Sequence, residues 1–559
     1  MLSESFFLNE LQWLDSFKAL HKRSPRVLHI GNIANNAYNN AKILTEFGLE
    51  NDVICYDYYH IMGTPEWEDA DFVADQIDQF APDWSKINLN GFSRPEWFVQ
   101  GPMDLCINYL LAKNQGDKSK QLQLWSILGC LNKTKSQTIY EVIQNQAKIC
   151  LTLINKFFSR LFKVLRKRID IFNNILKPND IWFYIYTLFL LPLFFIFKIL
   201  EYVAIKFIFR GEISDVQKGV TNVFLKELTF CYAEKFPNSK ITHEILENDL
   251  SYLNNDQLIN QWKKLFSFYD VVIGYSTDGI YPLVAEVPYL AFEHGTIREI
   301  PYQTDAQGRL CAVTYAKANH VMVTNFDCKK SADFLAPNRY TLINHPFDEN
   351  HGSKVYGAKE LRKKLLVDLK SDLIFFFPTR HDWVKGDGYA DKSNDIFINS
   401  FGKLREMGFK VGMVCCDWGK NVEASKKLLD AYNVSEYVIW SNPMATIQFE
   451  RMAMACDCVV DQFKLGSFGG VLFKAMAVGA PILTYLDEDK LKGQYAEMPP
   501  VINCKNEQEI IDAVRLTYTN KNLLDSLRQK SQSWIKTHHS KSQILNAQLK
   551  QFKLLIQDK

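Results

Sequence analysis

The sequence predicts an α/β protein with two Rossmann-like domains and a hydrophobic, basic helical insert in the first of them. Short apolar strands alternate with helix-forming segments in two separate series, and a stretch without this alternation interrupts the first series. A chain of 559 residues also exceeds what a single hydrophobic core supports. The predicted domains are residues 1–345, interrupted by the insert at 150–210, then residues 346–520, and last a set of C-terminal helices at 521–559 that pack back across both domains.

The composition is that of a folded protein, with 47% hydrophobic and 13% aromatic residues. The 65 Lys and Arg residues nearly balance the 63 Asp and Glu residues, so the net charge does not indicate a nucleic-acid partner. The 12 cysteines lack the paired spacing of a zinc ribbon. They indicate buried, reduced thiols in a cytosolic compartment, and we expect no metal site.

The first α/β series follows an N-terminal segment, "MLSESFFLNELQWLDSFKALHKRSP", that predicts an amphipathic helix. Its acidic residues and the lack of an apolar core before a cleavage site argue against a signal peptide. Strands are predicted at 26–32 and 52–56 with a helix between them, which is a βαβ opening. Strands at 271–274 and 289–292 flank a short helix and resume the same pattern.

The second series starts with "DLIFFF" at Asp372 and continues through "EYVIW", "CDCVVD" and "PILTYLD". Ligands of such domains bind at the carboxyl ends of the parallel strands. The polar stretch from Lys505 to Asp558 predicts a long helix that packs back across both domains.

The insert begins with a basic amphipathic helix, since apolar residues recur at helical spacing from Ile154 to Leu165 while lysine and arginine occupy the other face. The next apolar run, Ile181–Phe197, has 17 uncharged residues and is at the lower limit for a membrane span. A single span is excluded if the strands on both sides of the insert share one sheet. We therefore expect a monotopic helix at the cytoplasmic face of an anionic membrane. The predicted membrane contacts are Phe157, Arg160, Lys163, Arg166, Trp182 and Phe194. The alternatives are a protein-packed helix with a solvated basic face, or a hydrophobic hairpin used for dimerisation.

The stretch "KLGSFGGVLFKAMAVGAP" (464–481) combines a glycine-rich turn with a small-residue helix. The free N–H groups and the dipole of such a helix start favour phosphate. Ser467, Phe468, Gly469 and Gly470 are therefore predicted donor contacts, together with Asp461 at the end of the preceding strand.

Two cations in the loop "TRHDWVKGDG" follow the apolar strand "LIFFF". Arg380 offers a planar fork and Lys385 a point charge, and the pair can neutralise a diphosphate. The alternative is a solvated surface loop.

Two loops of the first series offer polar groups to the same cleft. "FEHGTIRE" presents Glu293 and His294 at a strand end, although the histidine can equally cap the following helix. "GNIANNAYNN" lacks the glycines of a dinucleotide-binding loop, which argues against an NAD-dependent dehydrogenase. Its polar residues predict an acceptor-binding surface; the alternative is a turn held together by asparagine side chains. The predicted acceptor contacts are Asn32, Asn35, Asn36 and Tyr38.

Together these segments resemble a GT-B glycosyltransferase, most closely the retaining family 4 group, also called glycosyl transferases group 1. The resemblance covers most of the chain except the insert. It implies that Arg380 and Lys385 hold the donor pyrophosphate and that His294 contacts the transferred sugar, with Glu293 orienting it or acting as a base. It also places Ser441 and Asn442, in "WSNPM", near the nucleotide base.

The sequence departs from the family at the two glutamates that contact the donor's sugar and ribose. The helix "KAMAVGAP" aligns Gly466 and Lys474 with those positions. A lysine cannot accept hydrogen bonds from ribose hydroxyls as a carboxylate does. Lys474 is therefore predicted to pair with phosphate or with Asp461, unless donor binding is lost.

The function expected from the resemblance is transfer of a hexose from a nucleotide-sugar to a lipid-linked or polysaccharide acceptor at the membrane surface. The reaction would retain the anomeric configuration and need neither a metal nor a further cofactor. Two alternatives stay open: a non-catalytic GT-B-like glycan-binding or scaffold protein at the membrane, and a nucleotide-sugar epimerase.

Overall fold

The computed structural model describes residues 2–72, 77–133, 221–253, 256–384, 391–467, 469–493, 495 and 497–557. Met1–Leu128 and Lys218–Lys559 form one compact unit, and Gly129–Gln217 form a second. The predicted membrane insert at 150–210 lies outside the described residues. Across the described ranges, no helix is both long enough and apolar enough to cross a membrane.

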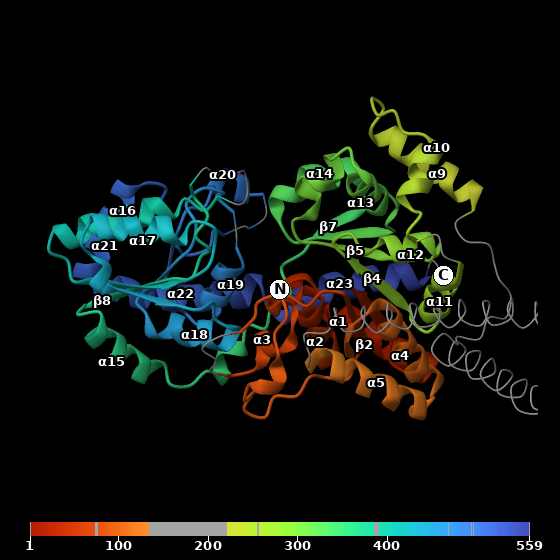
Figure 1. Cartoon of the computed structure of the whole chain (residues 1–559), viewed down its shortest axis with the longest axis horizontal. Helices are drawn as coiled ribbons and strands as arrows, with labels where there is room; N and C mark the ends of the chain where they lie inside the picture. The colour runs from red at the N-terminus through yellow and green to blue at the C-terminus, as the bar shows by residue number, and fades with distance from the viewer. Residues whose placement is uncertain are drawn as a thin grey trace, which may run out of the picture. The chain divides into compact units, whose positions relative to one another are not determined.

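The N-terminal half contains a seven-stranded sheet in which every strand pair is parallel (Figure 1). The strand order is β3-β2-β1-β4-β5-β6-β7, the Rossmann order with one further strand. The strands are β1 Arg26–Ile30, β2 Glu50–Tyr56, β3 Phe98–Gly101, β4 Val271–Tyr275, β5 Leu290–Glu293, β6 His320–Val323 and β7 Tyr340–Leu342.

Both faces of this sheet are covered by helices. Val27 of β1 faces a core formed with α1, α2 and α23, whereas its neighbour Leu28 faces a core formed with α4, α9, α11 and α13. The helices of this half are α1 Leu2–His21, α2 Asn36–Glu46, α3 Pro65–Asp69, α4 Met103–Gln115, α5 Lys118–Lys133, α9 Asn222–Lys235, α10 His243–Asp249, α11 Asp256–Phe266, α12 Ile280–Val284, α13 Ala306–Lys317 and α14 Lys329–Leu335. The predicted N-terminal helix is confirmed as α1.

The C-terminal half contains a second parallel sheet of six strands in the order β10-β9-β8-β11-β12-β13. The strands are β8 Leu373–Phe377, β9 Val411–Cys416, β10 Val438–Ser441, β11 Cys458–Val460, β12 Ile482–Thr484 and β13 Ile502–Asn503. The predicted α/β class with two Rossmann-like sheets is therefore confirmed.

The strand β8 shows why an uninterrupted apolar run forms here. Leu373, Phe375 and Phe377 pack on one face of the sheet, and Ile374 and Phe376 pack on the other. A strand in a parallel sheet with helices on both faces is apolar at every position. The helices of this half are α15 Ala358–Asp368, α16 Asn394–Glu406, α17 Val422–Ala431, α18 Thr446–Ala455, α19 Gly470–Ala477, α20 Glu488–Leu491, α21 Glu507–Thr519, α22 Lys521–His538 and α23 Lys541–Gln557.

The C-terminal stretch forms three helices, α21 to α23, rather than the single long helix predicted from Lys505 to Asp558. The breaks fall at Asn520 and at His539–Ser540. The ring of His539 is buried and its Nε2 lies 2.9 Å from the hydroxyl of Tyr495, which places the second break inside the protein. α22 packs on α19 of the second sheet, and α23 packs on α1, α2 and β4 of the first (Figure 1).

Candidate functional site

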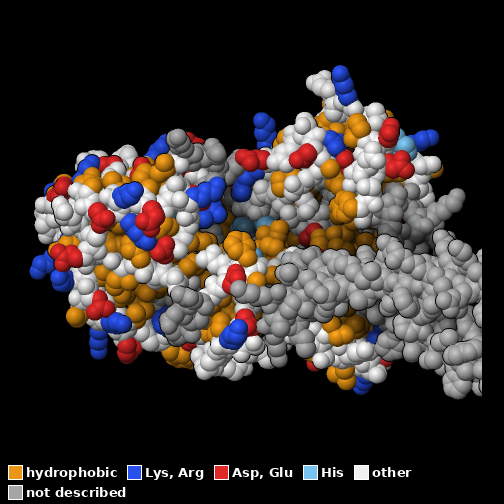
Figure 2. Space-filling view, in the orientation of Figure 1, with side chains coloured by type: hydrophobic (Ala, Val, Ile, Leu, Met, Phe, Trp, Pro, Cys, Tyr) orange, Lys and Arg blue, Asp and Glu red, His pale blue; other side chains and the backbone are white. Residues whose placement is uncertain are grey.

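A cavity of about 340 Å³ lies where the carboxyl ends of strands from both sheets meet. The first half contributes loops that follow β1 and β2, including Ala34, Ile61 and Trp67, and the second half contributes Arg380 and Asp461 after β8 and β11. Figure 2 shows apolar and histidine side chains in a hollow between the lobes that hold the two sheets, with lysine and arginine side chains near its rim. This is the position at which ligands of doubly wound folds bind.

Among the described residues, three cations of the second half line the cavity, Lys474 on α19 and two residues between β8 and α16, Arg380 and Lys392. Arg380 follows β8, is 45% exposed, and its Nε lies 2.7 Å from Asp382 Oδ2. Lys392, which the sequence interpretation missed, donates from Nζ to Gln462 Oε1 at 3.1 Å. Burial lowers the pKa of Lys392, while the nearby Asp461 opposes that shift. The predicted partner Lys385 lies in 385–390, outside the described residues.

Asp461 directly follows β11 and turns its carboxylate toward the glycine turn. Its Oδ1 accepts a hydrogen bond from the Thr379 hydroxyl at 3.1 Å, but its buried Oδ2 has no partner among the described residues. Burial raises the pKa of this carboxyl group. A Cβ atom placed on Gly469 would lie 3.2 Å from Oδ2, so the glycine lets the turn approach the carboxylate closely.

The glycine turn leads into α19, and Gly469 and Gly470 at its start both line the cavity. Ser467 does not line it; the backbone oxygen of Ser467 accepts a bond from Gln462 at 3.0 Å. Phe468 lies outside the described residues. Gly466 has a φ of +68°, and a side chain there would approach Asp487 Cβ to 2.8 Å. That position therefore cannot carry the carboxylate expected from the family.

Lys474, a predicted donor contact, lines the cavity, and its ammonium group bonds to Thr446 and Glu68 rather than to Asp461. Its Nζ donates to Thr446 Oγ1 at 2.6 Å and lies 3.1 Å from Glu68 Oε2. Glu68 belongs to α3 in the other half of the chain and is almost fully buried. Burial opposes its charged form, but the charges of Lys474, His351 and Lys42 outweigh that effect and lower its pKa.

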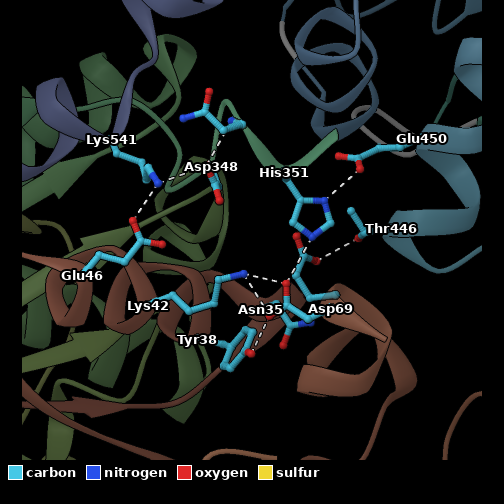
Figure 3. Close-up of polar contacts among 12 residues, drawn as sticks. Asn35, Tyr38, Lys42, Glu46, Asp69, Asp348, His351, Thr446, Glu450 and Lys541 are labelled. Carbon is cyan, nitrogen blue, oxygen red and sulfur yellow. Dashed lines mark hydrogen bonds and ion pairs between the residues drawn. The ribbon is translucent and has the colours of Figure 1, made fainter. Parts of the chain in front are cut away.

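A buried polar network continues behind Lys474 and joins the two halves (Figure 3). His351 places Nδ1 2.8 Å from Glu450 Oε2 of the second half and Nε2 3.1 Å from Asp69 Oδ1 of the first. Asp69 also accepts bonds from Lys42 at 2.6 Å and from the Tyr38 hydroxyl at 2.6 Å. Burial disfavours protonated His351, but the hydrogen bonds to both carboxylates outweigh it and raise the pKa to about 9.

Glu293 and His294, predicted as catalytic, do not line the cavity. Glu293 is fully buried and holds its own loop, because it accepts bonds from the N–H groups of Gly295 and Ile297 and from the Tyr315 hydroxyl. That arrangement corrects its predicted role as a base. His294 Nδ1 is buried without a partner among the described residues, and burial lowers its pKa to about 4.

All four predicted acceptor contacts form hydrogen bonds with other parts of the chain, three of them buried residues and Asn36 a partly exposed one. Asn32 donates to Gly63 O at 2.9 Å, and Asn35 donates to Thr64 O at 2.8 Å. Asn36 donates to Ile33 O at 2.9 Å, and the hydroxyl of Tyr38 is bound to Asp69. These bonds favour the alternative of a turn held together by asparagine side chains, because they hold the turn and tie it to neighbouring segments. From this loop, Ala34 reaches the cavity.

Ser441 and Asn442, predicted to lie near a nucleotide base, are adjacent to the cavity wall rather than part of it. The Ser441 hydroxyl donates to Cys415 O at 3.1 Å. The next two residues, Pro443 and Met444, line the cavity. Among the described residues, no group of three or more His, Cys, Asp or Glu side chains is arranged to hold a metal ion.

No family model and no curated protein matches the sequence. Solved structures do match. HepE from Anabaena, in complex with UDP and glucose, is 14% identical with a TM-score of 0.44, over 61% of this chain and 98% of that one. Sucrose-phosphate synthase from Thermosynechococcus elongatus is 14% identical with a TM-score of 0.42, over 58% and 82%. S. aureus TarM, in complex with fondaparinux, alpha-GlcNAc-glycerol and UDP, is 12% identical with a TM-score of 0.38, over 54% and 59%.

Proposed function

We propose that the chain is a GT-B glycosyltransferase that uses a nucleotide-sugar donor. The observation that carries the proposal is the cavity at the carboxyl edges of both parallel sheets, with Arg380, Lys392 and the start of α19 on one wall. Two cations and a helix N-terminus suit a diphosphate, whose charge they offset without a metal ion.

Different residues that line the cavity have different roles in donor binding. Arg380 and Lys392 bind the diphosphate, and its negative charge restores the pKa of Lys392 that burial lowers. The backbone N–H groups at the start of α19 point to the same anion. Lys474 also lines the cavity, and the buried Glu68 of the first half lies behind it and pairs with its ammonium group.

The finer parts of the proposal rest on the sequence. The resemblance to the retaining family 4 group supports transfer of a hexose with retention and without a bound metal. The basic and apolar pattern of residues 150–210 supports a lipid-linked or polysaccharide acceptor and a place at the cytoplasmic face of an anionic membrane. Analysis of the product's anomeric configuration by NMR tests the stereochemical part.

Calorimetric titration of the full chain with UDP, GDP and ADP tests the proposal. We expect one nucleotide to bind, and Arg380→Ala and Lys392→Ala each to weaken it about 10- to 100-fold, as loss of a charged hydrogen bond does. Arg515→Ala is the matched control, since Arg515 lies on α21 and is 58% exposed. Wild-type affinity in the Arg380 and Lys392 variants would contradict the assignment.

A non-catalytic glycan-binding or scaffold protein is the second candidate. The Lys474–Glu68 ion pair favours it, because Lys474 lines the cavity at the position where the family carries a donor-binding carboxylate, and its ammonium group is already paired. Absence of binding by all three nucleotides would support this candidate. A nucleotide-sugar epimerase is separated from both by product analysis, since it releases an isomerised nucleotide-sugar without an acceptor.

A further inference from the structure

The first sheet has its own topological switch point, between β1 and β4. The chain passes from β1 to β2 and β3 on one side, and then returns to place β4 on the other side of β1. A crevice opens at the carboxyl ends of the two strands at such a point, and ligands bind there. Gly31 directly follows β1, and Asp278 follows β4 by three residues.

The Asp278 carboxylate lies directly over the backbone of Gly31. A Cβ atom on Gly31 would come within 2.0 Å of Asp278 Oδ2, so a side chain at 31 would collide with it. Gly31 also has a φ of +88°, which favours glycine. Ser276, between β4 and Asp278, holds a positive φ of 56°. Strained backbone of this kind is concentrated at functional sites.

The surroundings of Asp278 are aromatic and uncharged except for one acidic neighbour. The Tyr56 hydroxyl donates to Asp278 Oδ1, and the ring of Tyr281 meets that of Tyr56 edge-on at 5.4 Å. The titratable groups that face this site are Cys55, Tyr56, Asp57, Tyr252 and Tyr281. Burial raises the pKa of Asp278 to about 7, and the hydrogen bond from Tyr56 opposes that shift. No lysine, arginine or histidine is among the groups that shift the pKa of Asp278.

Asp278 is nevertheless not sealed from solvent, because the side chain keeps intermediate exposure. It lies on the same edge of the first sheet as the cavity, since Gly31 beneath it and Ala34 in the cavity wall share one loop. The asparagines of that loop are occupied by internal bonds. Asp278 is thus a partly exposed carboxylate at the switch point, where those asparagines were expected to bind substrate.

We propose that Asp278 binds a hydroxyl group of the sugar-containing acceptor, with Tyr56 holding the carboxylate in place. The inference rests on the proposed function, since it assigns an acceptor contact on the same edge of the first sheet as the cavity. A carboxylate next to aromatic rings suits a neutral, polyhydroxylated ligand: the ionised group accepts hydrogen bonds from its O–H groups, and the rings cover its apolar faces. Tyr56 acts through Asp278 and is a positioning residue.

The test is NMR titration of the full chain with glucose, galactose and N-acetylglucosamine at pH 6 and pH 8, with and without the bound nucleotide. We expect the wild type to bind at least one sugar about tenfold more tightly at pH 8, because the ionised fraction of a group with a pKa near 7 rises about tenfold between those values. Asp278→Asn is expected to bind about tenfold more weakly at pH 8 and to lose the pH dependence.

The Tyr56→Phe variant tests whether Tyr56 positions the Asp278 carboxylate or only stabilises the fold. Loss of the hydrogen bond to the carboxylate raises its pKa, so the pH at which sugar affinity rises moves upward while binding persists. The matched controls are Asp333→Asn and Tyr302→Phe, whose side chains bond to other partners on the same half. Both are expected to keep the wild-type pH dependence.

The outcomes are distinct for the two proposals. Asp278→Asn is expected to melt no lower than the wild type at pH 8, because a carboxyl group whose pKa is raised by folding destabilises the folded state when it is ionised, so lost binding is not lost folding. Wild-type affinity in Asp278→Asn, or no binding of any of the three sugars, would overturn the inference while nucleotide binding still supports the glycosyltransferase. If the wild type binds a sugar but none of the nucleotides, the proposed function is overturned.

Discussion

The ammonium group of Lys474 lies between Thr446 of its own half and Glu68 of the other half, at 2.6 and 3.1 Å. Glu68 is 406 positions away in the chain, so no local pattern could have identified it as the partner. The sequence shows that a carboxylate is missing from the helix. Only the contact shows that a carboxylate of the first half pairs with this lysine.

Lys474→Met is expected to lower the free energy of unfolding by about 1 to 3 kcal/mol, because it leaves the buried Glu68 carboxylate without its cation. The double variant with Glu68→Gln should recover most of that loss, since no unpaired charge then remains. Urea unfolding of the wild type, both single variants and the double variant measures the coupling. Strictly additive effects would show that the two side chains do not stabilise each other.

At the scale of the element, the turn before α19 depends on close approach rather than on backbone strain. Gly469 has a φ of −110°, which any residue adopts, yet a Cβ there would lie 3.2 Å from the unpartnered oxygen of Asp461. Its neighbour Gly470 faces open space, with nothing within 4 Å of an added Cβ. A side chain at position 469 would therefore crowd Asp461, whereas one at position 470 would meet no protein atom.

Gly469→Ala is expected to weaken nucleotide binding about tenfold, because the methyl group displaces the Asp461 carboxylate or narrows the cavity. Gly129→Ala is the control, and its affinity should stay within about twofold, since its added methyl group meets no atom and the residue does not line the cavity. Calorimetric titration with the nucleotide that binds the wild type compares them. Equal affinities for the two variants would show that the approach of Gly469 to Asp461 does not matter for binding.

At the scale of the whole molecule, the two halves meet through a buried charge network. Asp69, Glu450 and Lys42 belong to it (Figure 3), together with the ion pair of Glu68 and Lys474. The charges balance when the ring of His351, which is 4% exposed, is also protonated. Buried ionic groups are stable only when they are paired in this way.

The raised pKa of His351 predicts a pH-dependent stability. The stabilisation is fully present below about pH 6.5, the ordinary pKa of histidine, and is lost as the pH rises through about 9. It amounts to roughly 2 to 3 kcal/mol at most. The Tm difference between wild type and His351→Gln should therefore be largest near pH 6 and shrink toward pH 10.

His320→Gln is the control for that measurement, because burial lowers the pKa of His320 to about 4 and the ring is neutral throughout this range. Its Tm difference from the wild type should not vary between pH 6 and 10. A constant difference for His351→Gln as well would show that His351 does not carry the charge that joins the halves.

Several elements of the fold could be predicted because their signals are local. An apolar run such as "LIFFF" indicates a strand buried on both faces, and the alternation of strands and helices indicates parallel sheets. Arg380, Asp461 and the glycine turn were found for the same reason, since each directly follows a strand and so lies at the carboxyl edge. Lys392 was missed because it lies beyond the loop, and no spacing rule marks it.

The sequence by itself determined the two parallel sheets and the edge at which the second sheet carries its polar residues, because periodicity and strand ends are properties of neighbouring positions. The tertiary structure alone decided which polar groups are free. Asn32, Asn35 and Glu293 are residue types that often bind ligands, yet their polar groups form hydrogen bonds inside the protein. Asp278 and Glu68 acquire their roles from residues far away in the chain, and a hydrogen bond depends on distance in space, not in sequence.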